Sequence, residues 1–186
     1  MPKILGGSLE EHRLTTRRRV FEALGTLMVD RSFDAITMAD LASAAGIGRT
    51  AIYNHFRDKE AVVVAFATDE TSRYLDRLEA ALAGARTPAD RLSTYVRHHV
   101  ETSAQFHFGL GPELYGMLSQ SALLEIRDHV VAVETVLRDI LAAGRSDGSF
   151  VDEEPAALVA LVHACLQPRQ VPADAAAAFV VRAVSA

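Results

Sequence analysis

The chain has 186 residues and a net charge of −5, with 49% hydrophobic and 23% charged residues. This is the composition of a globular protein, and it excludes an intrinsically disordered chain. Alanine fills 31 positions, whereas glycine and proline together fill 17. Because alanine is the best helix former and the other two interrupt helices, the composition favours an all-α fold.

Two further features bear on the compartment. Uninterrupted apolar runs reach seven residues, as in 61–67, against the roughly 20 that a membrane-spanning helix needs, so we expect no membrane partner. The single cysteine, Cys165, cannot form an internal disulfide, and residues 1–8 lack the apolar stretch of a secretory signal. Both observations favour a cytoplasmic location in a reducing compartment.

Charge is distributed unevenly along the chain. Residues 1–60 carry a net charge of +1, and residues 61–186 carry a net charge of −6. Positive charge is concentrated in two clusters of the first part. These are Arg13, Arg17, Arg18 and Arg19 near one end, and Arg49, Arg57 and Lys59 near the other. Such clusters are typical of a nucleic-acid contact, although a solvated helix face gives the same pattern.

The N-terminal third predicts three helices before a long one. Residues 9–31 carry apolar side chains at helical spacing and form an amphipathic helix. Thr37 followed by Asp40 resembles a capping box that opens a second, short helix, and Gly46 suits the positive φ that ends it. A third helix over 49–56 is mostly polar. Two short helices joined by a tight turn predict a helix-turn-helix, whose second helix enters the DNA major groove.

The remainder of the chain predicts six further helices, which makes about nine in the whole chain. Asp58 is the expected N-cap of the long helix, and Gly144 is expected to stop the helix that begins at Ser121. The predicted ranges are 59–84, 87–106, 113–118, 121–143, 153–166 and 172–184. No strand alternation or internal repeat interrupts this pattern.

The segment 33–60 resembles the DNA-binding segment of the tetracycline-repressor (TetR) family of transcriptional regulators. The resemblance is carried by Thr37 at a helix start, by Ala45-Gly46-Ile47 at the turn, and by Ile52-Tyr53-x-His55-Phe56-x-x-Lys59-Glu60. It covers about 50 residues, and the remainder is similar to the family only in the number and order of helices. Gly48 departs from the family, whose members often carry a serine cap there.

The resemblance implies a helix-turn-helix DNA-binding domain over 9–58 and a ligand-binding and dimerisation domain over 59–186. It implies a homodimer that binds a palindromic operator in double-stranded DNA and is released when a small-molecule effector binds. The outcome is expected to be repression. We expect no cofactor, no metal and no enzymatic activity.

Residues of the third helix are the best candidates for reading DNA. Arg49 and Thr50 stand at its start, nearest the base edges, and an arginine can bond guanine O6 and N7 together. The other candidate residues offer hydrogen-bond donors to phosphate oxygens. Two of them, Thr37 and Lys59, stand at helix N-termini, where the helix dipole favours an anion. The predicted DNA-binding residues are Thr37, Arg49, Thr50, Tyr53, Asn54, His55 and Lys59. Packing of Tyr53 against the first helix stays open, as does a structural role for Asn54.

Specific recognition by a helix-turn-helix needs two half-sites about 34 to 36 Å apart, and hence a two-fold dimer. The last two helices carry the apolar excess that the family uses as an interface. The predicted interface residues are Leu158, Leu161, Val162, Cys165, Leu166, Ala176, Phe179 and Val180. The alternative is that one side of each helix closes the core of its own protomer.

The implied effector pocket is expected among aromatic and polar residues in apolar surroundings. The predicted pocket residues are Tyr95, His99, Phe106, Phe108, Tyr115, Met117 and His163. Ordinary core packing is an equally open interpretation of each. The acidic balance of the second domain favours apolar or cationic effectors.

Three other classes of function fit the sequence less well. Five histidines in the second domain raise a metal- or haem-sensing regulator of the same architecture, but His163 and Cys165 stand at i and i+2 on a helix and point apart. An enzyme would need a phosphate loop, a nucleophile elbow or a helical zinc motif, and none occurs. A helical protein-interaction adaptor would leave the polar third helix unexplained.

Overall fold

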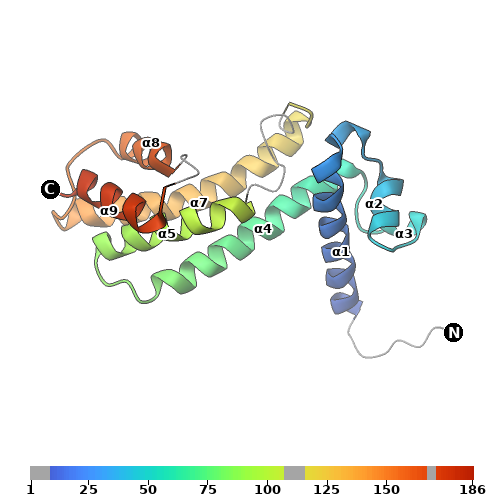
Figure 1. Cartoon of the computed structure of the whole chain (residues 1–186), viewed down its shortest axis with the longest axis horizontal. Helices are drawn as coiled ribbons and strands as arrows, with labels where there is room; N and C mark the ends of the chain where they lie inside the picture. The colour runs from blue at the N-terminus through green and yellow to red at the C-terminus, as the bar shows by residue number, and fades with distance from the viewer. Residues whose placement is uncertain (1–8, 107–115, 167–170) are drawn as a thin grey trace. The chain divides into compact units, whose positions relative to one another are not determined.

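The computed structural model describes residues 9–106, 116–166 and 171–186, with the side chains of 103–106 outside the description. These ranges contain eight α-helices, one 3-10 helix and no strand (Figure 1). The prediction of an all-α fold with about nine helices is confirmed. The short helix predicted over 113–118 falls largely outside the described residues. Within those residues, no helix combines the length and the apolar character that crossing a membrane requires.

The described residues divide into two compact units. The head unit comprises 9–68 and 116–126, and the body unit comprises 69–106, 127–166 and 171–186. Two continuous helices, α4 (Lys59–Leu82) and α7 (Gln120–Ser146), contribute residues to both units. The units are divided by packing, and the functional division of the chain at residue 58 stays a prediction.

The head unit is built on an aromatic core. Its other elements are α1 (Leu9–Asp30), η1 (Phe33–Ala35), α2 (Met38–Ala44) and α3 (Arg49–Tyr53). The ring of Phe21 lies 5.9 Å from that of Phe56 and 5.7 Å from that of Phe66, measured between centroids. The beginning of α7 joins this core through Ala122 and Ile126, each at most 4% exposed. Burial of each large apolar side chain contributes about 1.5–3 kcal/mol, so this core holds the short helices in place.

Local signals place the turns of the head unit. Thr37 Oγ1 accepts the Asp40 N–H, and the Asp40 carboxylate accepts the Thr37 N–H, which completes the predicted capping box. Gly46 has the predicted positive φ, 65°. The third helix is shorter than the 49–56 that we predicted, because the amides of Asn54 and His55 turn to carbonyls three residues back and tighten the chain.

The body unit has a second core. Here α5 (Pro88–Phe106) packs against α9 (Ala173–Val184) and against α8 (Pro155–Leu166). The loop after α7 is tied to the end of α9, since the Val151 N–H donates to Val184 O over 2.8 Å and the Ala186 N–H donates to Ser149 O over 3.1 Å. These bonds fix α9 against the rest of the unit.

Gly144 lies inside α7, so the prediction that it ends this helix was wrong. A Cβ at this position would lie 2.1 Å from Cδ2 of Phe150, whose side chain is only 3% exposed. The glycine therefore allows the Phe150 ring to approach the helix backbone closely. The helix ends at Ser146, just before Gly148, which takes a φ of 77°.

Replacing Gly144 should destabilise the body unit. In Gly144→Ala the new methyl group collides with the Phe150 ring, and overpacking of this kind costs about 1–3 kcal/mol, which exceeds the roughly 1 kcal/mol that alanine gains in a helix. Gly84→Ala is the matched control, because nothing lies within 4 Å of a Cβ there. Urea unfolding followed by circular dichroism measures both, and an unchanged midpoint for Gly144→Ala would contradict this packing role.

Candidate nucleic-acid interface

The helix α3 presents one polar face outward and one apolar residue inward. Ile52 is fully buried, whereas Arg49, Thr50 and Asn54 are exposed. Tyr53 is 52% exposed. The burial of Ile52 therefore orients the helix so that the predicted base-reading residues face solvent.

Thr37 uses its hydroxyl within the capping box. Its Oγ1 donates to Asp40 Oδ2 over 2.6 Å and accepts the Asp40 N–H over 3.1 Å. These hydrogen bonds from Thr37 lower the pKa of the Asp40 carboxyl below its ordinary value. A phosphate at this helix start would therefore meet the remaining first-turn N–H groups of α2 rather than a free hydroxyl.

Lys59 does not extend toward solvent. Its Nζ donates to the carbonyls of Phe33, Asp34 and Ile36 over 2.9, 3.2 and 3.4 Å, and it lies 4.5 Å from the centroid of the Phe33 ring. An ammonium group has three donors, and all three are used here. We expected Lys59 to contact phosphate; in the structure it instead joins the first turn of α4 to the chain that leads into α2.

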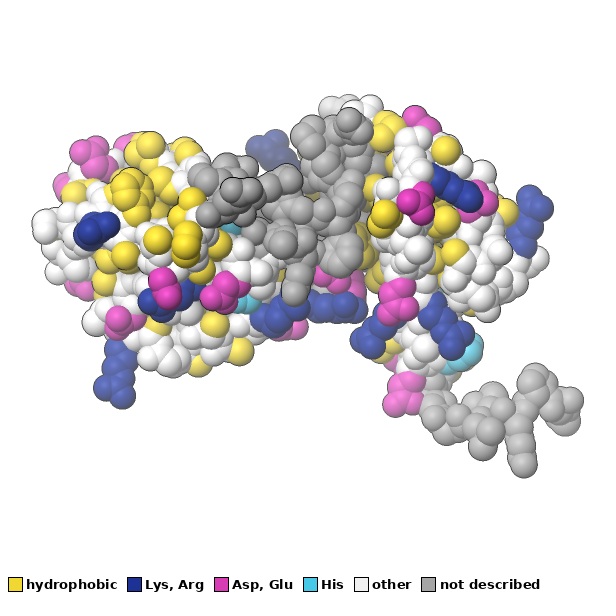
Figure 2. All heavy atoms as spheres, in the orientation of Figure 1, with side chains coloured by type: hydrophobic (Ala, Val, Ile, Leu, Met, Phe, Trp, Pro, Cys, Tyr) yellow, Lys and Arg dark blue, Asp and Glu magenta, His cyan; other side chains and the backbone are white. Residues whose placement is uncertain are grey.

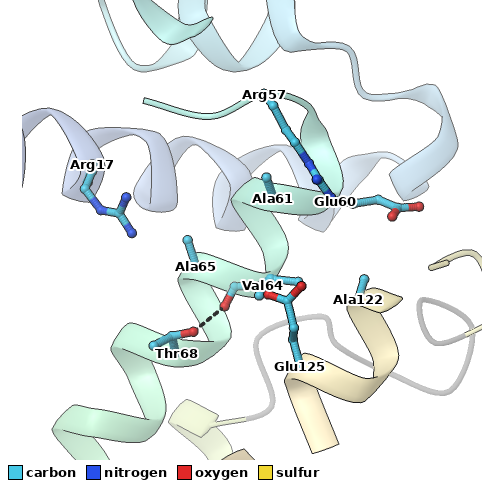
Figure 3. Close-up of a pocket in the computed structure, with 9 residues that line it drawn as sticks. All are labelled: Arg17, Arg57, Glu60, Ala61, Val64, Ala65, Thr68, Ala122 and Glu125. Carbon is cyan, nitrogen blue, oxygen red and sulfur yellow. Dashed lines mark hydrogen bonds between the residues drawn. The ribbon is translucent and has the colours of Figure 1, made fainter. Parts of the chain in front are cut away.

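The neighbouring residue, Glu60, makes a second tie in another direction. Its carboxylate accepts the Ser119 hydroxyl over 2.6 Å and the Ser119 N–H over 3.2 Å, just before α7 begins. A hollow of about 370 Å³ lies beside this tie within the head unit (Figure 3). Small residues of α4 and α7, including Ala61, Ala65 and Ala122, leave this space, and Arg17 extends toward it from α1.

His55 is half-buried at the end of the turn after α3. Burial lowers the pKa of its imidazole, and the positive charges of Arg13 and Arg17 and the nearby His12 lower it further. The ring is therefore neutral in the free protein at neutral pH. Its environment is cationic, which suits the predicted contact with phosphate.

Three of the predicted pocket residues come together in the body unit. The Tyr95 hydroxyl lies 3.4 Å from Nε2 of His163, and the rings of Tyr95 and His99 stack with centroids 6.2 Å apart. Sequence reasoning missed two members of this cluster. Tyr74 is 2% exposed, with its hydroxyl 3.3 Å from Nδ1 of His99, and the His98 ring lies 4.8 Å from the Tyr74 ring. Tyr74 lies on α4 and the two histidines lie on α5, and the apolar spacing within each helix does not show which residues of two helices meet.

Burial shifts the pKa of four groups in this cluster. Burial raises the pKa of Tyr74 and Tyr95. Burial lowers the pKa of His98 and His163, and Arg77 lowers that of His98 further. All four groups are therefore neutral near pH 7. Among the residues that the structure describes, Nε2 of His98 is one of two buried side-chain atoms without a hydrogen-bond partner.

The other predicted pocket residues lie elsewhere. Met117 packs against the core of the head unit. Phe108, Tyr115 and the side chain of Phe106 lie outside the described residues. In the parts of the chain that are described, no three His, Cys, Asp or Glu side chains gather as a metal site would require.

The predicted interface residues separate into two groups. Leu161 on α8 is 63% exposed and Phe179 on α9 is 56% exposed. Cys165 is half-buried. The others are buried in the protomer itself, and they are Leu158, Val162, Leu166, Ala176 and Val180. For these five, the alternative holds that the helices close their own core, because α8 and α9 pack on each other and on α5.

Comparison with known proteins finds a family match within the head unit. Residues 21–66 match the family model for bacterial regulatory proteins of the tetR family. The match spans α2, α3 and the residues that bury them, and the resemblance seen in the sequence is confirmed. The match covers 46 of the 186 residues, and this segment is similar to the DNA-binding segment of the tetR family.

Two curated relatives extend this likeness. The chain is 36% identical over 73 residues to the HTH-type transcriptional regulator AlkX of Mycobacterium tuberculosis, which covers 39% of this chain and 35% of AlkX. It is 27% identical over 139 residues to the HTH-type transcriptional repressor KstR2 of Mycolicibacterium smegmatis, which covers 72% of this chain and 67% of KstR2. The match thus spans about a third of the length of AlkX.

The fold of the chain also resembles solved structures. The fatty acid degradation regulator FadR from Bacillus halodurans superposes with a TM-score of 0.76 at 18% identity, over 90% of this chain and 93% of FadR. At this identity the likeness concerns the fold. The relatives are regulators, and none of these names describes an enzyme.

The tie made by Lys59 should contribute to the stability of the head unit. Lys59→Met keeps most of the aliphatic stem but removes three hydrogen bonds, and leaving their acceptors unpaired should cost about 1–3 kcal/mol. Arg57→Met is the control, because Arg57 is 75% exposed and pairs only with Asp58 at the surface. Amide hydrogen exchange in α2 and urea unfolding measure the effect. Equal losses in both variants would count against the tie.

Proposed function

We propose that this protein is a transcriptional repressor of the tetR family, which binds a palindromic DNA operator as a homodimer and is released by a small-molecule effector. The observation that carries the proposal is the outward face of α3, where Arg49 and Thr50 are exposed at the helix start while Ile52 is fully buried. The family assignment of residues 21–66 supports it. Such a regulator acts in the cytoplasm, where bacterial DNA lies.

The proposed DNA contacts are of two kinds, those that read base edges and those that position the helix on the duplex. Arg49 and Thr50 read base edges in the major groove, and an arginine bonded to guanine O6 and N7 contributes about 1–3 kcal/mol of discrimination. Tyr53, Asn54 and His55 contact phosphates and set the register of the helix on the duplex. Thr37 acts through the N–H groups of its helix start, and Lys59 acts by holding η1.

The dimer forms through α8 and α9. Figure 2 shows apolar side chains gathered over these two helices, and Leu161 and Phe179 are the large exposed ones. Exposed apolar residues on neighbouring helices favour a protein interface. A two-fold arrangement gives two copies of α3, as two half-sites of an operator require.

The effector binds at the tyrosine–histidine cluster of the body unit. The neutral rings of Tyr74, Tyr95 and His163 supply an aromatic wall, and the unpaired Nε2 of His98 offers one polar contact. Glu134 is the charged group that acts on both Tyr95 and His163. This environment favours a neutral or cationic effector over an anionic one.

Regulation requires that the effector prefer one conformer. A shift from 1:99 to 99:1 needs a preference of about 5.5 kcal/mol. Because α4 and α7 contribute to both units, and because Glu60 ties the start of α4 to Ser119, a displacement of either helix reaches the residues that hold α3. We assign the coupling to these two helices.

Arg49 should determine sequence preference, whereas Tyr53 should not. Selection from random duplex DNA supplies the operator, and affinities are then measured for it and for each single base-pair change. Arg49→Ala should lose 1–3 kcal/mol of discrimination, roughly, at one position, whereas Tyr53→Phe should weaken all duplexes about equally. Failure of the selection to enrich any sequence would contradict the proposed function.

The exposed apolar pair should hold the dimer together. Leu161→Glu combined with Phe179→Glu places charges on the proposed interface and should give monomers in analytical ultracentrifugation at micromolar concentration. Leu124→Glu is the control, since Leu124 on α7 is exposed to a similar extent, 54%. A dimer that survives the double substitution would exclude this surface.

A further inference from the structure

Basic and titratable side chains of two separate elements converge on one side of the head unit. His12, Arg13 and Arg17 come from α1, and His55 comes from the turn after α3. Arg13 and Arg17 stand four residues apart and share a helix face. All three α1 side chains lie close enough to act on the charge of His55. Figure 2 shows arginine or lysine side chains and a histidine together over α1.

The aromatic core fixes one of these cations in place. The guanidinium carbon of Arg17 lies 5.1 Å from the centroid of the Phe56 ring and 5.7 Å from that of the Phe21 ring. Phe56 follows His55 directly and is 3% exposed. A cation over the face of an aromatic ring is attracted by the ring quadrupole. This attraction favours a guanidinium position beside Phe56, the residue that follows His55.

The described carboxylates do not pair with Arg13 or Arg17, although Glu60 and Glu125 line the same hollow as Arg17. Among the described residues, neither Arg13 nor Arg17 has an acidic partner within 4.0 Å. On the segment of His55 itself, Arg57 pairs with Asp58 over 3.0 Å, and Lys59 is bound to η1 carbonyls. Positive side chains without ion-pair partners therefore lie around a neutral imidazole. An anion bound among them would favour the protonated form of the His55 ring.

We propose that His12, Arg13, Arg17 and His55 form one phosphate subsite, where a DNA backbone phosphate binds and His55 takes up a proton as it does so. The proposal rests on the proposed function and deepens it. Duplex DNA, rather than a free phosphate ion, is the source of the phosphodiester, because Tyr53 and Asn54, two exposed residues of the DNA-reading face, immediately precede His55.

The direction of the pH dependence follows from linkage. In the free protein the pKa of His55 is lowered by burial first and by its cationic neighbours second, so the ring is neutral at pH 7. A bound phosphate raises this pKa, and the complex then holds more protons than the separate partners. DNA affinity should therefore rise as pH falls, by up to about tenfold per pH unit for each protomer that takes up one proton.

The test compares pH profiles of DNA affinity. Fluorescence anisotropy at constant ionic strength, from pH 8 to 5.5, is measured with the selected operator for the full chain and for His55→Gln. The wild-type profile should steepen toward acid, and His55→Gln should lose about one proton of uptake per protomer. His129→Gln, a half-buried histidine on α7 in the body unit, is the matched control and should keep the wild-type slope.

A second variant and a direct measurement complete the test. Arg17→Ala should lower affinity for every duplex and reduce the slope of log affinity against log salt by about one per protomer. Imidazole resonances of the wild-type protein should show the pKa of His55 rising on addition of operator, which needs no His55 variant to fold. Millimolar inorganic phosphate should not reproduce this rise.

The outcomes separate the subsite from the wider function. If operator binds tightly but His55→Gln keeps the wild-type pH profile and the His55 resonance does not move, the subsite is wrong and the regulator stands. If inorganic phosphate shifts the resonance as operator does, the DNA assignment of the subsite is overturned. If no duplex binds at any pH, the proposed function itself fails.

Discussion

The structure of the head unit depends on the burial of two side chains, Ile52 and Phe56, which are at most 3% exposed. The helix between Arg49 and Tyr53 has only five residues, and a helix of that length is not stable by itself in water. Its orientation is imposed by what it packs against: α3 packs on α2, and Phe56, three residues beyond its end, contacts the Phe21 ring of α1. The outward face, which carries Arg49, Thr50 and Tyr53, is a consequence of that inward anchoring.

Two adjacent residues then connect this core to the rest of the chain. Lys59 donates to carbonyls of 33–36, and Glu60 accepts from Ser119 before α7. One tie sets the position of α2 relative to α4, and the other sets the position of the α7 start. In the proposed mechanism, the reading helix must be held in place and must also respond to a ligand bound in the body unit, which needs such contacts at one place. The first turn of α4 provides them.

The candidate binding sites of the two units differ in charge. In the proposed phosphate subsite, Arg13 and Arg17 form no ion pair with a described carboxylate, so positive charge remains for an anion. Four rings of the cluster around Tyr74 and Tyr95 are neutral, because burial raises the pKa of both tyrosines and lowers that of His98 and His163. The net charge of −5 for the whole chain conceals this division. Local charge, rather than the total, is what a polyanion encounters.

Structural features that depend on residues close together in the chain could be predicted from the sequence. The capping box of Thr37 and Asp40, the positive φ of Gly46 and the helix-turn-helix pattern all depend on residues within four positions of each other, where backbone sterics and hydrogen bonding act directly. The alternation of apolar residues at helical spacing indicated which faces would be buried. These features are local, and they were predicted correctly.

Long-range packing decided the rest. The ammonium of Lys59 found acceptors 23 to 26 residues away, Gly144 sits inside α7 because the Phe150 ring needs its space, and five apolar residues of α8 and α9 turned to the core of their own protomer. Hydropathy identifies a side chain that will be buried but not the surface that will bury it. That choice belongs to the folded chain, where each group meets its partners in space.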